Sequence, residues 1–161
     1  MSCKKGGFVT IRHNNIRDFE SNLLKKVCND VELEPKLIPV NDDEARLDIR
    51  ARGFWRPGQS AFFDVCLTNT NAPSQVNASL CKIYKKHEDE KKRKYNERVI
   101  NNEHGSFTPL VFSITGGMSK ECSIYHKFLS EKIAQKTEQR YDQVMSCFAL
   151  SSWLSITENE H

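Results

Sequence analysis

The sequence lacks the features that would identify several large classes of protein. No apolar run approaches the roughly 20 residues that a membrane-spanning helix needs. The N-terminal MSCKKGGF has basic residues with no apolar segment behind them, so a secretory signal is not expected. Neither an internal repeat nor a low-complexity linker interrupts the 161 residues, a length that suits one domain with its own core. We therefore expect a single intracellular domain over residues 1–161, without a membrane partner.

Paired cysteines are also lacking. The six cysteines are scattered and form no CxxC pair: Cys3, Cys28, Cys66, Cys81, Cys122 and Cys147. In an intracellular chain this spacing argues against a disulfide framework and against a self-contained zinc finger, so most of them are expected to be buried as small apolar residues. Cys3 is the exception, because it could be the last ligand of a site that begins upstream.

Charge of one sign is not in large excess, since the formal net charge is only +3. The basic residues are nevertheless concentrated. Arg12, His13 and Arg17 form one group, and the second occupies a single stretch: Lys82, Lys85, Lys86, Lys91, Lys92, Arg93, Lys94 and Arg98. Such groups suit contacts to phosphate, although the small net charge does not by itself identify a nucleic-acid partner.

Hydrophobic periodicity predicts the order of the elements. Helices are expected over residues 11–29, 79–101, 119–136 and 140–154, and strands over 31–40, 45–51, 61–68 and 107–113. This order predicts an α/β fold in which helices flank a mixed sheet of about four strands. The core would span about residues 8–118. A C-terminal helical extension, about 119–155, would contribute apolar side chains: Val144, Phe148, Leu150 and Trp153.

Two of the predicted strands each carry one aspartate among alternating apolar residues. The apolar faces are formed by Leu47, Ile49 and Ala51 in the first strand and by Phe63, Val65 and Leu67 in the second. In each strand the aspartate, Asp48 or Asp64, lies on the face opposite to these apolar residues. Arg-Pro-Gly at 56–58 is typical of a turn. A hairpin closed there would place the two carboxylates nearly opposite each other. Facing carboxylates repel, and a hard divalent cation bound through oxygen usually compensates. The pair therefore predicts a metal site.

The predicted helix over residues 79–101 adds a lysine to this site. Its sheet-facing stripe is expected to contain Leu80, Tyr84, Tyr95 and Val99. Lys91 falls in the middle of the stripe and His87 at its edge, whereas Lys92 points sideways and Lys94 toward the opposite flank. A lysine in an apolar stripe costs free energy unless it reaches water or meets a carboxylate, which Asp48 or Asp64 could supply.

A lysine beside two metal-binding aspartates is the arrangement used in metal-assisted phosphodiester hydrolysis. The metal polarises the phosphate and activates the attacking water, and the lysine orients that water or stabilises the developing charge. The residues thus predict Asp48 and Asp64 as metal ligands and Lys91 as the third catalytic group.

These motifs resemble the PD-(D/E)XK restriction-like nuclease core, and more closely the endonuclease domain of LINE-type retrotransposon polyproteins. That family has a P-D-I-like strand, a D-V-x-V strand and a downstream K-x-x-K-Y. The corresponding segments here are Leu47-Asp48-Ile49, Asp64-Val65-Cys66-Leu67 and Lys91-Lys92-Arg93-Lys94-Tyr95. Arg12-His13-Asn14, following Cys3 and Gly6-Gly7, resembles the family's entry segment, which a zinc knuckle often precedes. The resemblance covers most of residues 3–118.

The chain departs from the family pattern at two positions. Leu47 replaces the usual proline, and Cys66 stands where many restriction-like nucleases carry a lysine on the third strand. The transposon-type family takes its lysine from the helix, in agreement with Lys91. The second departure also fits a copy that folds without cutting.

Several residues keep two interpretations. Arg12 and His13 could cap and salt-bridge the first helix or hold a phosphate, and Lys92 and Lys94 could contact phosphate or form a solvated face. Tyr95 fits core packing better than a role in catalysis. For three further features the structural alternative is favoured: Glu20 as an exposed glutamate rather than an extra metal ligand, residues 115–117 (Thr-Gly-Gly) as a plain turn rather than a phosphate site, and Trp55 as an anchor of the hairpin or a surface residue rather than a base-stacking platform.

The sequence therefore predicts a Mg²⁺- or Mn²⁺-dependent DNA endonuclease that nicks its target. The resemblance implies origin in a retrotransposon polyprotein with an upstream reverse transcriptase, and an intracellular, nuclear location. DNA contacts are expected from Arg12, His13, Lys92, Lys94 and Tyr95. Two alternatives remain: a catalytically inactive nucleic-acid-binding domain of the same fold, and an interaction domain whose basic helix binds an acidic protein.

Overall fold

The computed structural model describes residues 6–73, 77–138 and 140–145. Its elements follow one another in this order: α1 (Gly6–Lys25), β1 (Val31–Leu33), β2 (Ile49–Arg52), β3 (Ser60–Thr68), α2 (Leu80–Arg98), the π-helical turn η2 (Val99–Glu103), β4 (Ser106–Ser113) and α3 (Lys120–Thr137). The predicted order of helix, three strands, helix, strand and helix is thus confirmed as far as α3, and most of the second C-terminal helix predicted over 140–154 lies outside the described residues.

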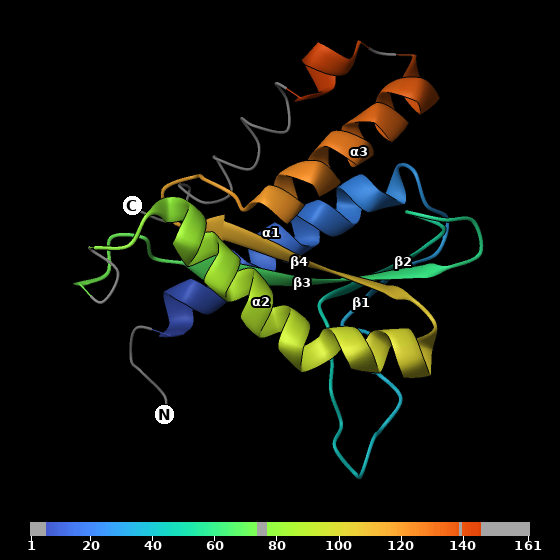
Figure 1. Ribbon diagram of the computed structural model, residues 1–161. Coiled ribbons are helices and arrows are strands. Elements are labelled where there is room, and N and C mark those ends of the chain that lie inside the picture. Colours follow the sequence, from blue (N-terminus) through green and yellow to red (C-terminus); the bar gives the residue numbers. More distant parts are fainter. Residues whose placement is uncertain (1–5, 74–76, 139, 146–161) are drawn as a thin grey trace.

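The four strands form one mixed sheet in the order β1-β2-β3-β4 (Figure 1). β1, β2 and β3 pair antiparallel, whereas β4 pairs parallel to β3 after the crossover through α2. β4 is an edge strand, which explains how it accommodates Pro109, a residue without an N–H group to donate to a neighbouring strand. The chain is therefore a mixed α/β protein with helices around a four-stranded sheet.

Helices cover both faces of the sheet (Figure 1). On one face, α1 and α3 enclose a core that includes Phe63 and Val65 of β3 together with Leu24 and Tyr125. On the other face α2 packs over a smaller core: Leu37, Leu47, Phe62, Tyr95, Val99 and Phe107. Phe62 lies on this second face, and so does Asp64, two residues further along the strand. The side chain of Asp64 therefore points toward α2.

Residues 34–48 form a narrow hairpin that projects from the sheet, which we call the finger (Figure 1). Backbone hydrogen bonds join Leu37 N to Ala45 O (2.9 Å) and Leu47 N to Pro35 O (3.2 Å). Asn41 and Asp42 at its tip both have positive φ, 50° and 61°, as a tight hairpin turn requires. The two long strands predicted over 31–40 and 45–51 are therefore wrong in extent, because only their outer ends join the sheet and their inner parts pair with each other.

The finger also changes the face on which Leu47 lies. Ile49 and Ala51 pack under α1 and α3, as alternation with Asp48 predicts, but Leu47 packs under α2. The prediction that Leu47 shares a face with Ile49 is wrong, because the chain leaves the sheet at Asp48 and turns into the finger. On β3, by contrast, Phe63, Val65 and Leu67 share one face as predicted.

The helix boundaries differ from the predicted ones where local propensity is weak. α1 begins at Gly6 and ends at Lys25, so both of its ends come several residues earlier than the predicted 11–29. The early start was not predicted because glycine has a low helix propensity. On α2, Leu80 is 55% exposed and so is not part of the sheet-facing stripe. Ile83 and Glu88 are buried there in addition to Tyr95.

Other predictions about packing have mixed outcomes. Cys28 and Cys122 are buried, but Cys66 is only half-buried and Cys81 is exposed, so burial of most cysteines is not observed among those described. Val144 is buried as predicted. Cys3, Cys147 and the remaining predicted core residues of the extension, Phe148, Leu150 and Trp153, lie outside the described residues. In the described ranges, no helix has both the length and the apolarity to cross a bilayer.

Candidate active site

Four side chains from four segments meet where the finger joins the sheet: His13 of α1, Asp48 at the base of the finger, Asp64 of β3 and Lys91 of α2. The pairing of Ile49 with Phe63 in the β2–β3 ladder puts Asp48 opposite Asp64. The predicted convergence of the two aspartates on one face is thus observed. The glycines at positions 53 and 58 of the connecting turn have φ of 81° and 77°, and Gly53 N donates to Gln59 O (2.7 Å), which closes the hairpin.

Asp48 is held by partners on both sides. Its Oδ2 atom accepts the N–H of Val65 (2.7 Å) and lies 3.0 Å from Nε2 of His13. Burial disfavours the charged carboxylate, but the hydrogen bond to His13, the charge of His13 and the Val65 amide outweigh it, so the pKa of Asp48 is lowered. Asp48 is therefore an ionised group at neutral pH.

Asp64 has the opposite electrostatic character. It is buried in β3 beneath α2, and its Oδ2 atom lies 2.6 Å from Nζ of Lys91. Burial raises the pKa of Asp64 to about 6; Lys91 opposes this effect and the neighbouring Asp48 carboxylate adds to it. The two carboxyl groups are also close enough for a hydrogen bond between them when one is protonated. Near pH 6 the two carboxyl groups can thus share one proton, so that the pair carries one negative charge and not two.

Lys91 remains charged in this environment. Burial disfavours its ammonium group, but the carboxylate of Asp64 outweighs that effect, so the pKa of Lys91 is raised above its ordinary value. Its Nζ also lies 6.0 Å from the centre of the Tyr95 ring. A lysine in this state cannot accept a proton at neutral pH, but it can donate hydrogen bonds and compensate negative charge.

His13 was predicted as a phosphate contact or a helix-capping residue, and the structure places it beside Asp48. The interaction with Asp48 raises the pKa of His13 despite partial burial. No sequence signal could have found this contact, because 35 residues separate the two partners and it depends on how α1 crosses the end of the sheet. The neighbouring Arg12 is half-buried on the same helix.

The remaining predicted contact residues are distributed along α2. Lys92 forms an ion pair with Glu121 of α3, and Lys94 lies on the exposed side with its Nζ 5.0 Å from the Tyr95 ring centre. Tyr95 is buried against Phe107 (5.7 Å between ring centres), so it has the packing role that the sequence favoured. Of these three residues, Lys94 is the one most open to a ligand.

The two carboxylates next to α3 were missed or misjudged from the sequence. Glu20 was expected to be exposed, but it is completely buried and is bonded to Tyr125 (3.0 Å) and His126 (2.6 Å). That expectation is wrong because α3 covers this part of α1. Glu88 is buried too, and it accepts the N–H of Glu121 in the first turn of α3 (3.3 Å). A carboxylate at that position compensates the unpaired amides of a helix N-terminus.

A second layer of polar side chains lies next to Asp64 and Lys91. It contains Cys66 and Thr68, which come after Asp64 on β3, and His87, one turn before Lys91 on α2. His87 Nε2 lies 3.0 Å from Thr68 Oγ1, and His87 Nδ1 lies 3.9 Å from Cys66 Sγ. Cys66, the residue in place of a third-strand lysine, thus faces a histidine. Burial raises the pKa of the Cys66 thiol. This layer separates the acidic pair from the start of α2.

The turn over residues 115–117 and Trp55 have the structural roles favoured above. Gly116 N donates to Ser113 O (3.1 Å) and Gly117 N to Ser113 Oγ (2.9 Å), which closes the turn after β4. Trp55 packs against Phe54 and Phe128, each 4.8 Å away between ring centres, and so anchors the β2–β3 connection.

The carboxylate oxygens of Asp48 and Asp64 are the donor atoms that a divalent cation would meet at this site. Within the described ranges, no three or more His, Cys, Asp or Glu side chains are grouped so that they could hold an ion unaided. Mg²⁺, however, is commonly bound through one or two carboxylates, with water and phosphate oxygens completing its shell. Asp48 and Asp64 supply that number, and their bonds to His13, Val65 and Lys91 all use Oδ2. The pair therefore fits Mg²⁺ in the presence of a phosphate substrate.

Comparison with protein-family models finds none that matches the chain, and comparison with curated proteins finds no significant match.

Proposed function

We propose that the chain is a restriction-endonuclease-like domain that hydrolyses DNA phosphodiester bonds with Mg²⁺ or Mn²⁺, derived from a LINE-type retrotransposon polyprotein. The observation that carries the proposal is the contact between Lys91 and Asp64 (2.6 Å) beside the paired carboxylate of Asp48. Two acidic groups and one cation converge although 43 residues separate Asp48 from Lys91 in the sequence.

The fold supports this proposal in two ways. The element order helix, three strands, helix, strand and the mixed four-stranded sheet are what the resemblance predicts. The lysine also comes from α2 and not from β3, where Cys66 replaces it, and this is the arrangement expected of the transposon-type domain. A reverse transcriptase upstream in the parent polyprotein and a nuclear location belong to the same proposal.

Asp48 and Asp64 would hold the cation, with the backbone carbonyl next to Asp64 as a further ligand. The bound ion would polarise the phosphate and lower the pKa of a water molecule. His13 fixes Asp48 through its 3.0 Å contact, and the Val65 amide fixes the same oxygen, so the ligand cannot rotate away. Lys91, permanently charged, orients the attacking water and stabilises the negative charge that develops on the phosphate.

The DNA backbone would lie along α2 and the start of α1. Lys94 and Arg12 are the proposed phosphate contacts, with Lys92 joining them if it leaves Glu121. These contacts supply affinity without sequence information. Tyr95 would act through packing, since the ammonium groups of Lys91 and Lys94 both lie close to its ring.

Incubation of the purified chain with supercoiled plasmid tests the proposal. We expect nicked and linear DNA with Mg²⁺ or Mn²⁺, none with EDTA, and loss of cutting in Asp48→Ala and Asp64→Ala. Asp89→Ala, which removes an exposed carboxylate of α2 paired with Lys85, is the matched control and should cut normally. Intact plasmid with both metals, or cutting that survives Asp64→Ala, would contradict the catalytic assignment.

A non-cutting nucleic-acid-binding domain of the same fold is the second candidate. It is favoured by the observation that Lys91 and His13 already compensate the two carboxylates. This candidate predicts salt-sensitive DNA binding that is indifferent to chelators and to Asp48→Ala.

A further inference from the structure

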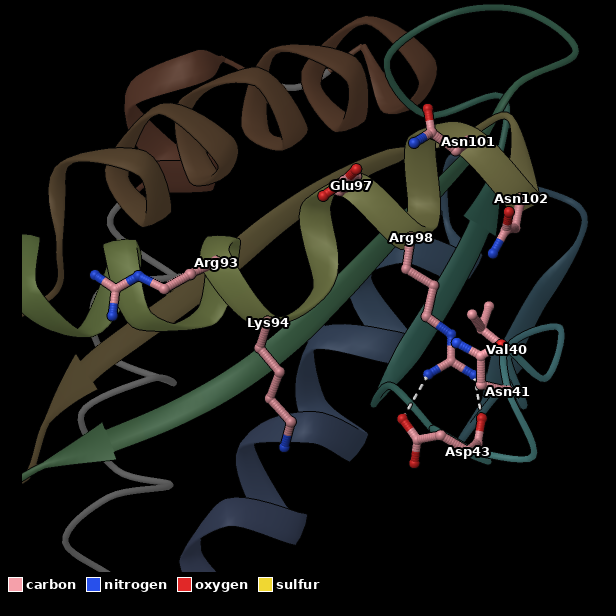
Figure 2. A pocket seen from close by; sticks show the side chains of 9 residues that line it. All are labelled: Val40, Asn41, Asp43, Arg93, Lys94, Glu97, Arg98, Asn101 and Asn102. Carbon is pink, nitrogen blue, oxygen red and sulfur yellow. Dashed lines mark hydrogen bonds and ion pairs between the residues drawn. The ribbon is translucent and has the colours of Figure 1, made fainter.

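A hollow of about 490 Å³ lies between the finger and the C-terminal half of α2 (Figure 2). Val40, Asn41 and Asp43 line it from the finger, and residues of α2 and η2 line it from the other side. Its volume is within the range of roughly 300–1,000 Å³ that is typical of small-ligand sites. Lys94, which borders it, follows Lys91 by one helical turn, so the hollow adjoins the candidate active site.

The wall of the hollow combines cations and side-chain amides with the carboxylates of Asp43 and Glu97. Arg93 and Lys94 are exposed cations of α2 whose side chains point in different directions in Figure 2, whereas Arg98 projects toward the finger. Asn41, Asn101 and Asn102 add three amide groups, each with a donor and an acceptor. Cations bind phosphate oxygens, and asparagine amides pair with the edges of bases.

The finger is fixed to α2 at this point, so the hollow has defined walls. Arg98 donates to the carbonyl oxygens of Ile38 (3.0 Å) and Asp43 (2.5 Å) and to the Asp43 carboxylate (3.2 Å). The N–H of Ile38 donates to Glu103 at the end of η2 (2.6 Å). Arg98 and Asp43 thus neutralise each other, which leaves Arg93 and Lys94 as the cations on the rim.

We propose that this hollow binds one nucleotide of a DNA strand and reads its base. The phosphate would contact Lys94, and the base edge would face Asn41 and Asn102. The choice of a DNA strand as the occupant depends on the proposed function. It is supported by the position of the hollow along α2, the helix that supplies Lys91. The hollow gives the enzyme a base preference a short distance from the cut, which the phosphate contacts alone cannot provide.

The acidic residues at the finger tip agree with this orientation. Asp42 and Glu44 are exposed carboxylates of the finger and would repel a phosphate backbone, whereas Arg98 compensates Asp43. The strand would therefore place its phosphates beside Lys94 on α2 and its base toward the finger. A carboxylate facing a base edge can accept a hydrogen bond from the amino group of cytosine or adenine.

Binding of fluorescent homopolymers dA, dC and dT by the full chain, without metal, tests the proposal. Asp64→Asn serves as the parent so that no cutting interferes. We expect the parent to prefer one homopolymer by about tenfold, the order that one good base contact gives. Asn41→Gly with Asn102→Ala should bring the homopolymers to within about twofold of one another. Glycine keeps the positive φ of position 41, so the finger can still close.

A charge variant separates phosphate contact from base reading. Lys94→Gln should weaken binding to every homopolymer alike. It should also lower the slope of the logarithm of affinity against the logarithm of salt concentration by about one. Lys86→Gln, an exposed lysine on the first half of α2, is the matched control with little effect.

Two outcomes would overturn the proposal: equal affinity for all homopolymers, or a preference that survives the asparagine double variant in a chain with an unchanged melting curve. The failure of this proposal is distinguishable from failure of the nuclease assignment. Plasmid cutting without base preference would overturn only the nucleotide site, and base preference without cutting would overturn only the nuclease.

Discussion

Ionisation of the Asp64 carboxylate lowers the stability of the folded chain. Its pKa is raised to about 6 from 3.8, so the folded chain binds the proton more tightly than the unfolded chain. The contribution of Asp64 to stability is therefore greatest below about pH 4 and is lost as the pH rises through 6. Above that range the ionised carboxylate disfavours folding by roughly 3 kcal/mol. A carboxylate kept at this cost is typical of a functional site.

Asp64→Asn should accordingly raise the free energy of unfolding at pH 8 by up to roughly 3 kcal/mol and change it little at pH 4. Urea denaturation of the variant and the parent at both pH values measures the difference. Asp89→Asn, on the solvent side of α2, should leave stability within about 0.5 kcal/mol at either pH. A loss of stability at pH 8 would show instead that the ion pair with Lys91 outweighs the burial of Asp64.

Lys91 is the residue whose replacement separates turnover from binding. Lys91→Gln keeps much of the side-chain length and removes the charge, so we expect a fall in kcat of about 10²–10³-fold, as for the loss of one group that stabilises a transition state. DNA affinity measured with Ca²⁺ should change little. Lys94→Gln should give the opposite pattern, with weaker binding and unchanged turnover. Equal losses of affinity and turnover in both variants would mean that Lys91 is an ordinary phosphate contact.

At the level of single residues, the sequence predicted the acidic pair and Lys91 because their faces follow from simple periodicities. Asp48 and Asp64 needed only strand alternation and a turn at 56–58, and Lys91 needed only a helical wheel. His13 and Glu20 could not be assigned in this way, since each meets partners from distant segments: Asp48 for the first, Tyr125 and His126 for the second.

The elements were predictable where a pattern continued and unpredictable where it stopped. β3 and α3 have nearly the predicted bounds because both keep one period over their length. The two strands around the finger were predicted too long, since residues 35–47 continue the extended pattern but pair with each other. Alternation cannot tell pairing within a hairpin from pairing with the sheet, so the change of face at Leu47 was invisible.

The connection from η2 to β4 contains a glycine that no other residue can replace without movement. A Cβ atom on Gly105 would lie 2.5 Å from the backbone oxygen of Ser60, in the adjacent strand β3. Gly105→Ala should therefore reduce the free energy of unfolding by about 1–3 kcal/mol, because backbone must shift to admit the methyl group. Ser106→Ala at the next position adds no atom and should have a much smaller effect. Comparable melting temperatures for the two variants would contradict this close approach.

The whole molecule supplies the site because four separate segments meet at one end of the sheet. The crossover through α2 makes β4 parallel to β3 and lays α2 over Asp64, while α1 crosses the other face and reaches Asp48 with His13. None of these segments holds the arrangement alone. A ligand that binds the acidic pair should therefore stabilise the complete fold and not a part of it.

Magnesium should raise the melting temperature in proportion to its occupancy of Asp48 and Asp64. At ten times the dissociation constant, binding adds about 1.4 kcal/mol, which corresponds to roughly 3–6 °C for a domain of this size. The increase should be full at pH 8 and smaller at pH 5, where protonated Asp64, with its pKa of about 6, no longer provides a charged ligand. Asp48→Asn should abolish the increase, and Asp89→Asn should preserve it. Thermal unfolding with and without the metal, at both pH values, checks all four expectations. A metal-induced increase that persists in Asp48→Asn would mean that the ion binds elsewhere, and the same increase at pH 5 and pH 8 would mean that Asp64 is not a ligand.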